Sequence, residues 1–442
     1  MHAKHLINGA FNTWHIYCNA ANSESESPNP LRGKIMTRNF IPKPLRLVAL
    51  LLFSHAIFAA EYPTAEVNTT GLAITDDVVT VGILHSVTGT MAISESGSVE
   101  AEKLAIKQIN EMGGVLGRQI EVIQEDGASD WPTFAEKARK LLVQDKVASV
   151  FGCWTSASRK AVLPVFEKEN GMLYYPTFYE GLEQSKNVIY TGQEATQQII
   201  AGLDWVAKEK GAKSFYLIGS DYIWPRTSNK IARKHIENVL KGKVVGEDYY
   251  PLGHTNFGSL INKIKLKKPD VIYSIVVGGS NVSWYKQLKA AGITSDKWTL
   301  LTISVTEDEL LGIGGENAVG FYAAMKYYQS LDNDNNKNFV AEFKKMWGDD
   351  SVIGDVTQAA YLGPWLWKLA VEKAGSFDVD KIAVASNGIE FTGAPEGYVR
   401  VHDTNHHLWS KTRVGRILKD GQYDVIFESD LVEPNPFPEG YQ

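Results

Sequence analysis

The sequence is poor in cysteine and has no excess of positive charge. Its 442 residues include only two cysteines, Cys18 and Cys153, so neither a disulfide framework nor a cysteine-rich zinc site can form. Lysine and arginine total 45 against 51 aspartate and glutamate residues, which gives a net charge of -6. This balance gives no electrostatic basis for binding nucleic acid or an anionic membrane surface.

Recognised catalytic and metal-binding motifs are also absent. The sequence contains no P-loop and no G-x-S-x-G elbow. Ser283–Lys286 matches S-x-x-K, but the companion motifs S-D-N and K-T-G are missing, and we interpret Ser283 as a helix N-cap. Asn405–His407 lacks the spacing of a zinc site and indicates a turn with hydrogen-bonded imidazoles. We therefore expect no catalytic residue, no metal, no cofactor and no enzymatic activity.

The N-terminal region has the pattern of an export signal. The apolar run Leu47–Phe53 is too short to span a bilayer, follows three basic residues and precedes a tract of small residues. That order is typical of a secretory signal peptide. We predict a cleaved signal at 36–60 after an upstream extension at 1–35, with the true start at either Met1 or Met36. No cysteine follows the apolar run, so no lipid anchor is expected.

From Val78 onward, short apolar runs alternate with helical periodicity. Val79–Leu84 has the composition of a buried strand, and apolar residues from Ala101 to Met112 then recur on one face of a helix. The same alternation repeats along the chain. Strands alternating with helices favour parallel sheets covered on both faces, and the length fits two such lobes. The sequence therefore predicts an α/β fold with two doubly wound parallel-sheet lobes.

The loops that follow the predicted strands are rich in aromatic rings and hydroxyl groups and contain few cations. They lie at 85–90, 152–158, 175–181, 220–226 and 278–281. Ligands of open α/β sheets bind at the carboxyl ends of the strands. Rings and hydroxyl groups suit a small, planar, neutral and polar ligand. The alternative is that these rings pack in the core without contacting a ligand.

Several long stretches carry a resemblance to a known family. The chain from about Val78 to its C-terminus resembles the type I periplasmic solute-binding proteins of ABC transporters for branched-chain amino acids, amides and urea. Within this superfamily it is most similar to the group that binds urea or short-chain amides. The stretches that match are Gly82–Ser86, Gly89–Glu95, Ser129–Ala138, Gly152–Lys160, Ser220–Arg226 and Asn405–His407.

The resemblance implies two lobes joined by three hinge crossovers, near 191–194, 322–328 and 397–402. One lobe would comprise 78–192 plus 326–398, and the other 193–325 plus 399–442. The ligand-binding residues carried over from the family are Trp154, Ser156, Tyr175, Thr177, Tyr222 and Trp224. Thr155 and Gly278, in the loops after the predicted strands, complete the predicted ligand-binding set.

The same resemblance implies a periplasmic component of an ABC importer. Its partners would be urea or a short aliphatic amide and the membrane permease subunits, without direct membrane insertion. The segment 277–281 lacks the acidic residue that amino acid binders use to bind the ammonium group of their ligand. The segment 174–179 resembles the matching loop of amide sensors. An amide-responsive regulator of the same fold, a branched-chain amino acid binder and an amide hydrolase remain alternatives. Urea, formamide and acetamide all stay open as ligands.

Overall fold

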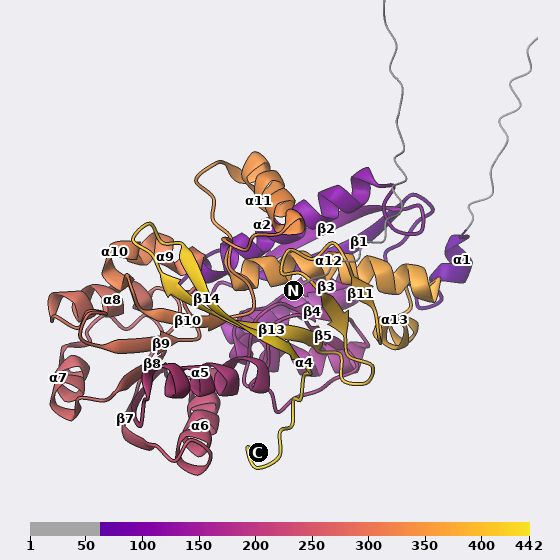
Figure 1. The fold of residues 1–442 in the computed structure, drawn as a ribbon. Helices are drawn as coiled ribbons and strands as arrows, with labels where there is room; N and C mark the ends of the chain where they lie inside the picture. The colour runs from indigo at the N-terminus through magenta and orange to yellow at the C-terminus, as the bar shows by residue number, and fades with distance from the viewer. Residues whose placement is uncertain (1–61) are drawn as a thin grey trace, which may run out of the picture. The chain divides into compact units, whose positions relative to one another are not determined.

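The computed structural model describes residues 62–442, which form two α/β lobes (Figure 1). The predicted extension at 1–35 and signal at 36–60 lie outside the described residues. Within 62–442, no helix has both the length and the apolar composition needed to cross a membrane.

The first lobe is built on a parallel five-stranded sheet with the order β2-β1-β3-β4-β5. Its strands are β1 (Val78–His85), β2 (Gln119–Asp126), β3 (Val150–Gly152), β4 (Leu173–Tyr175) and β5 (Val188–Tyr190). The helices between these strands are α2 (Ala92–Glu111), α3 (Trp131–Arg139), the π-helical turn η1 (Lys140–Gln144) and α4 (Ser156–Glu169). The predicted strand at Val79–Leu84 and the helix that follows it are confirmed.

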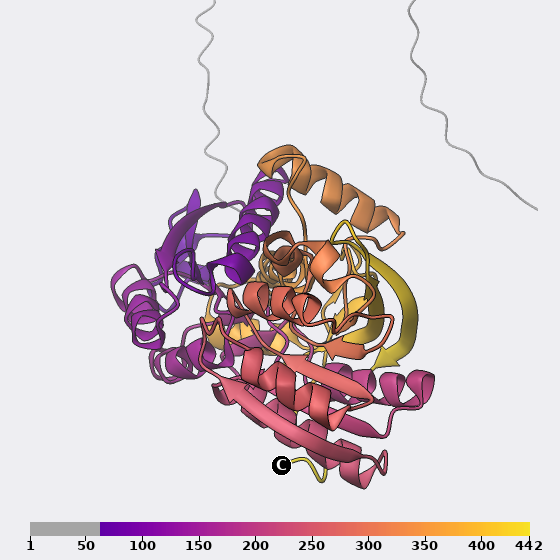
Figure 2. The ribbon, with the colours of Figure 1, turned by 90° about the vertical axis from the view of Figure 1, so that its left-hand side faces the viewer.

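A later part of the chain completes this lobe. Helix α12 (Asp355–Ala374) packs against α2 and the first sheet, and α11 (Asp334–Trp347) lies beside α2 (Figure 2). Trp367 of α12 lies 6.1 Å from the ring of Phe151 on β3, which in turn lies 5.5 Å from Tyr174 on β4. Truncating a buried tryptophan such as Trp367 typically costs about 3–5 kcal/mol, so α12 is an integral part of this core. The short helices α1 (Thr64–Val67) and α13 (Val379–Ser386) also contribute side chains to the core of the first lobe.

The second sheet has nine strands within the described residues. Strands β6 (Ser214–Ser220), β7 (Lys243–Tyr250), β8 (Val271–Ile275), β9 (Thr299–Thr302) and β10 (Tyr322–Met325) are parallel. The connecting helical segments are η2 (Thr196–Ile200), α5 (Ala201–Lys210), α6 (Ile223–Asn238), α7 (Gly258–Lys267), α8 (Ser280–Ala290), α9 (Glu307–Ile313) and α10 (Gly315–Ala318). Because α8 begins at Ser280 with Gly279 as its N-cap, the predicted N-cap role of Ser283 is wrong.

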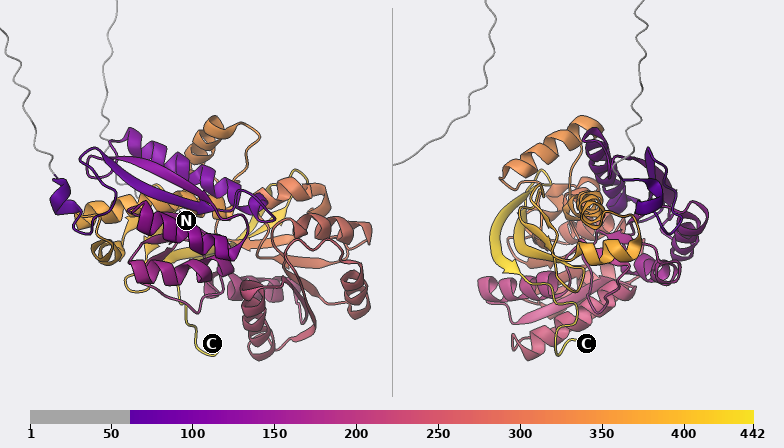
Figure 3. Two further views of the ribbon diagram at one scale, coloured as in Figure 1. Left: turned by 180° about the vertical axis from the view of Figure 1, so that it is seen from behind. Right: turned by 90° about the vertical axis from the view of Figure 1, so that its right-hand side faces the viewer.

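The C-terminal strands of this sheet run antiparallel, which sequence analysis did not predict. Strands β11 (Glu390–Phe391), β12 (Val399–Val401), β13 (Leu408–Ile417) and β14 (Tyr423–Val432) extend the sheet from β10. The yellow hairpin of β13 and β14 is prominent in Figure 3. The turn pair Asp420–Gly421 before the alternating pattern of β14 is the signal that could have revealed this hairpin.

The predicted turn at Asn405–His407 is confirmed just before β13. The Asn405 side chain accepts the backbone N–H of His407 at 3.1 Å, and His407 Nε2 lies 2.5 Å from the hydroxyl of Tyr179. Burial is the main cause that lowers the pKa of His407 to about 3, so its imidazole is neutral at physiological pH. Within 62–442, no group of three or more histidine, cysteine, aspartate and glutamate side chains could hold a metal ion.

Candidate ligand-binding site

Aromatic side chains from both lobes meet where the loops after β3, β4 and β6 face each other. Trp154, after β3, lies 5.7 Å from Phe178 and 6.5 Å from Trp224 in the first turn of α6. Phe178 and Trp224 are separated by 5.3 Å between ring centroids. A second pair between the lobes joins Trp131 and Tyr222 at 6.3 Å. The structure therefore brings together Trp154 and Trp224, two residues that the sequence placed in one site.

Four of the predicted site residues carry a buried polar atom without a hydrogen-bond partner anywhere in 62–442. These atoms are Trp154 Nε1, Thr177 Oγ1, the Tyr222 hydroxyl and Trp224 Nε1. An unsatisfied buried donor costs about 1–3 kcal/mol. An indole N–H can only donate. These four atoms come from the loops that meet between the lobes, where a ligand could supply their hydrogen-bond partners.

The electrostatic surroundings keep the Tyr222 hydroxyl protonated. Burial first, and then the neighbouring Tyr175 and Glu180 groups, raises the pKa of Tyr222 well above its usual value. The hydroxyl is therefore a hydrogen-bond donor at every physiological pH.

Three other predicted residues use their hydroxyl groups within the protein. Thr155 is the N-cap of α4, where its Oγ1 accepts the backbone N–H of Ser158 at 2.9 Å. Tyr175 donates its hydroxyl proton to the carbonyl of Trp154 at 2.7 Å. The Ser156 hydroxyl donates to Glu180 at 2.6 Å. These side chains support the loop geometry, and their free hydrogen-bonding capacity is smaller than the sequence suggested.

Sequence analysis missed a buried charged network behind Ser156. Arg159 Nε donates to Glu183 at 2.8 Å, and the Lys160 ammonium lies 2.6 Å from the other Glu183 oxygen. Burial alone would raise the pKa of Glu183, but the charges and hydrogen bonds of Arg159 and Lys160 outweigh it and lower that pKa to about 2. Arg159 follows Ser156 by three residues in α4 and lies on the same helix face. This spacing is the signal that could have indicated the contact between Arg159 and Ser156.

Gly278, the last predicted site residue, lies at a contact between backbones of the two lobes. Its φ is +62°, and a Cβ atom there would lie 2.8 Å from the carbonyl oxygen of Thr90 and 2.9 Å from the sulfur of Met91. The next residue, Gly279, donates its backbone N–H to the same Thr90 carbonyl at 3.1 Å. Glycine at 278 thus permits the loop before α8 to approach the loop before α2.

We expect Gly278→Ala to weaken ligand binding by at least about 10-fold, because the added Cβ opposes the approach of the lobes. Gly211→Ala is a matched control: its φ is +61°, but a Cβ there would meet no atom within 4 Å. Both variants carry the cost of a left-handed alanine. Calorimetric titration and thermal melts of the two variants separate the effects. Equal affinities would contradict the assigned role of Gly278.

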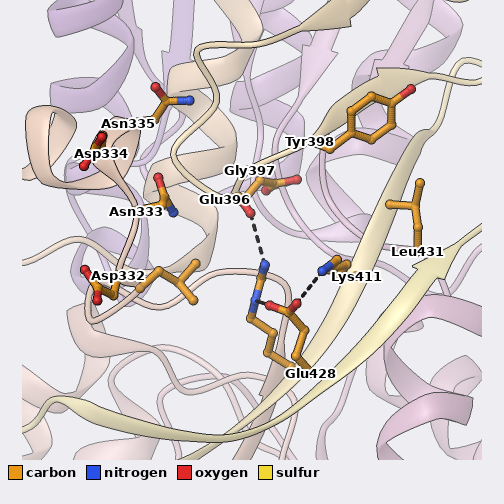
Figure 4. Close-up of a pocket in the computed structure, with 12 residues that line it drawn as sticks. Asp332, Asn333, Asp334, Asn335, Glu396, Gly397, Tyr398, Lys411, Glu428 and Leu431 are labelled. Atoms are coloured by element: carbon orange, nitrogen blue, oxygen red, sulfur yellow. Dashed lines mark hydrogen bonds and ion pairs between the residues drawn. The ribbon is translucent and has the colours of Figure 1, made fainter. Parts of the chain in front are cut away.

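A separate pocket of about 630 Å³ lies away from the aromatic contact, between the N-terminal part of α11, the segment 396–398 and the hairpin β13–β14 (Figure 4). Its two cationic side chains share one carboxylate: Glu428 accepts from Arg413 at 2.7 Å and also from Lys411. None of the predicted site residues lines this pocket. We therefore keep the contact between the lobes as the candidate site, because its polar atoms are the ones that need partners.

Comparisons with known proteins agree with this architecture. The chain is 24% identical over 389 residues to the Leu/Ile/Val-binding protein homolog 6 of Brucella melitensis, covering 86% of this chain and 95% of that protein. It is 26% identical over 317 residues to a Pseudomonas aeruginosa protein that binds leucine, isoleucine, valine, threonine and alanine, covering 70% of this chain and 82% of that protein.

A solved structure gives a similar match. It is a solute-binding protein of an ABC transporter from Rhodopseudomonas palustris BisB5 in complex with 3,4-dihydroxybenzoic acid, with a TM-score of 0.73 and 25% identity. The match covers 81% of this chain and 98% of that chain. The family model for the periplasmic binding protein domain matches residues 79–442 of this sequence. The chain therefore belongs to the periplasmic binding protein family.

Proposed function

We propose that this protein is the solute-binding component of an ABC importer and that its two lobes hold urea or a short aliphatic amide. Membrane permease subunits would receive the ligand from it. The lobe bounds and hinge crossovers given under Sequence analysis are part of this proposal. The similarity to solute-binding proteins over most of the chain supports the transport role.

The observation that carries the ligand assignment is the set of unpartnered polar atoms at the contact between the lobes. Two indole N–H groups and the Tyr222 hydroxyl are hydrogen-bond donors without a partner in 62–442, and they come from both lobes. The rings of Trp154, Phe178 and Trp224 can cover the faces of a planar group. Urea and carboxamides combine a planar group with a carbonyl oxygen.

Charge distinguishes this ligand from those named for the relatives, which are aliphatic amino acids and an aromatic acid. A carboxylate buried at the site would need a cation, but the nearby Arg159 is already bound by Glu180 and Glu183. An ammonium group would need an acceptor, and the loop at 276–281 contains no carboxylate. A neutral ligand avoids both desolvation costs.

Calorimetric titration of the purified mature protein tests this assignment. The ligand panel is urea, formamide, acetamide, leucine and 4-hydroxybenzoate. We expect at least one of the first three to bind and the last two to bind at least about 100-fold more weakly, because each leaves a buried charge without a partner. Leucine or 4-hydroxybenzoate binding as tightly as the best neutral ligand would refute the assignment. An assay for ammonia release from the same amides tests the hydrolase alternative.

We also propose that residues 36–60 direct export and are then removed, so that the mature chain begins near Ala60 or Glu61 and is released into the periplasm without a lipid anchor. N-terminal sequencing of the periplasmic fraction checks this start. Leu50→Arg, which places a charge within the apolar run, should retain the chain in the cytoplasm. An intact chain recovered from the cytoplasm of cells expressing the unaltered protein would contradict the export proposal and favour an intracellular regulator.

A further inference from the structure

The Ser156 hydroxyl is held by two buried charged side chains. It donates to Glu180 Oε2 at 2.6 Å and accepts a hydrogen bond from Arg159 Nη1 at 3.1 Å. Arg159 Nη2 also donates to the second oxygen of Glu180 at 3.3 Å. The three side chains therefore form a closed triangle at the first turn of α4.

This triangle fixes which way the Ser156 proton points. A hydroxyl group has one proton and two lone pairs, a carboxylate only accepts, and a guanidinium only donates. The Ser156 proton is therefore directed to Glu180, and one lone pair is occupied by Arg159. The remaining lone pair can only accept a hydrogen bond.

Arg159 cannot turn away from this arrangement to serve a ligand. Its guanidinium lies over the rings of Tyr175 and Tyr179, 4.7 and 4.4 Å from their centroids, and its Nε donates to Glu183. With Lys160 beside Glu183, the network contains two cations and two carboxylates and is neutral overall. An anionic ligand therefore finds no uncompensated positive charge there.

We propose that Glu180 is a specificity-determining residue: by holding the Ser156 proton, it makes Ser156 an acceptor that selects ligands with an N–H group and rejects the corresponding carboxylates. The inference rests on the proposed function and deepens it. Ser156 begins α4 two residues after Trp154, whose indole N–H has no partner within the described part of the chain. A carboxamide can accept from such donors with its oxygen and donate to Ser156 with its nitrogen. A carboxylate has no proton to donate to Ser156.

Glu180→Gln should reverse this selectivity. Arg159 Nη2 donates to one side-chain oxygen at position 180, so the glutamine must place its amide oxygen there and its NH₂ group toward Ser156. Ser156 would then accept two hydrogen bonds, and its proton would turn toward the ligand. Formamide and formate are the matched probes. By calorimetry we expect formamide affinity to fall about 10-fold and formate affinity to rise about 10-fold.

Glu183→Gln is the control for charge. It removes the same single negative charge from the network, but Glu183 contacts Arg159 and Lys160 and has no hydrogen bond to Ser156 among the residues described. Its formamide-to-formate preference should stay within about threefold of wild type. An equal shift in both variants would overturn the inference, because charge alone would then explain the selectivity.

Ser156→Ala provides a second measurement that does not depend on the folding of Glu180→Gln. It should lower formamide affinity and leave formate affinity unchanged, and Glu180→Gln added to it should no longer alter the preference. Unchanged formamide affinity in Ser156→Ala overturns the inference. If the wild-type protein binds neutral amides but Glu180→Gln keeps the wild-type preference for formamide over formate, the inference about Glu180 is wrong and the proposed function still stands. A wild-type protein that binds no urea or amide overturns both the proposed function and this inference.

Discussion

Replacing Trp224 by alanine is expected to weaken binding of the neutral ligand by about 30- to 1,000-fold. Buried aromatic anchors at the centre of an interface typically contribute about 2–4 kcal/mol, which corresponds to that range. Trp224 supplies an indole donor without a partner in 62–442 and ring contacts to Trp154 and Phe178 of the other lobe. Its loss removes a hydrogen bond and the aromatic cover together. Calorimetry with the best ligand of the panel measures the effect.

Trp347→Ala is the control for this variant. Trp347 is a partly buried tryptophan at the end of α11 that packs on the first core, and it does not belong to the aromatic contact between the lobes. It should lower the melting temperature and leave affinity near wild type. If Trp224→Ala binds as tightly as wild type, the aromatic contact is ordinary packing between the lobes and the assigned site is wrong.

Arg159→Met is expected to lower the free energy of unfolding by about 3–5 kcal/mol. It removes the charge but keeps most of the side-chain volume, and it leaves the buried carboxylates of Glu180 and Glu183 without their shared cation. Breaking a buried ion pair from one side costs this much because the remaining charge stays desolvated. Urea-free denaturation, with guanidinium chloride as denaturant, measures the loss without adding a candidate ligand.

Arg416→Met tests whether the loss of unfolding free energy in Arg159→Met arises because the Arg159 ion pairs are buried. Arg416 pairs with Asp424 at 2.6 Å, but both side chains are about half exposed, at 50% and 43%. Exposed pairs contribute about 0–1 kcal/mol, so this variant should unfold close to wild type. Equal destabilisation of the two variants would show that the buried network contributes no more than a surface pair.

The main architecture could be predicted because it depends on local pattern. Apolar runs alternating with helical periodicity identified the strand at Val79–Leu84 and the helix after it, and parallel strands place their following loops at one edge of a sheet. The hairpin β13–β14 escaped prediction because its strands belong to a sheet whose other members lie far away in the sequence. The N-cap of α8 was misplaced because Gly279 has no side chain to identify it as a cap.

The site could be predicted in part for a similar reason. Trp154 and Trp224 stand in loops whose composition is unusual in itself, whereas the role of Ser156 depends on Glu180, which is distant in sequence and buried. Glutamate is rarely buried, so the sequence alone predicts that a glutamate in a loop is exposed to solvent. Which hydroxyl groups are consumed within the protein, as for Thr155 and Tyr175, follows only from three-dimensional contacts.

The late position of β13 and β14 has a consequence for how the chain folds. Tyr322 of β10 pairs with Arg416 of β13, so the second sheet stays incomplete until the C-terminal residues are available. The first core likewise waits for α12. High contact order slows folding, because distant segments must meet before their contacts stabilise the structure. Neither core can therefore be completed before the C-terminal part of the chain has been synthesised.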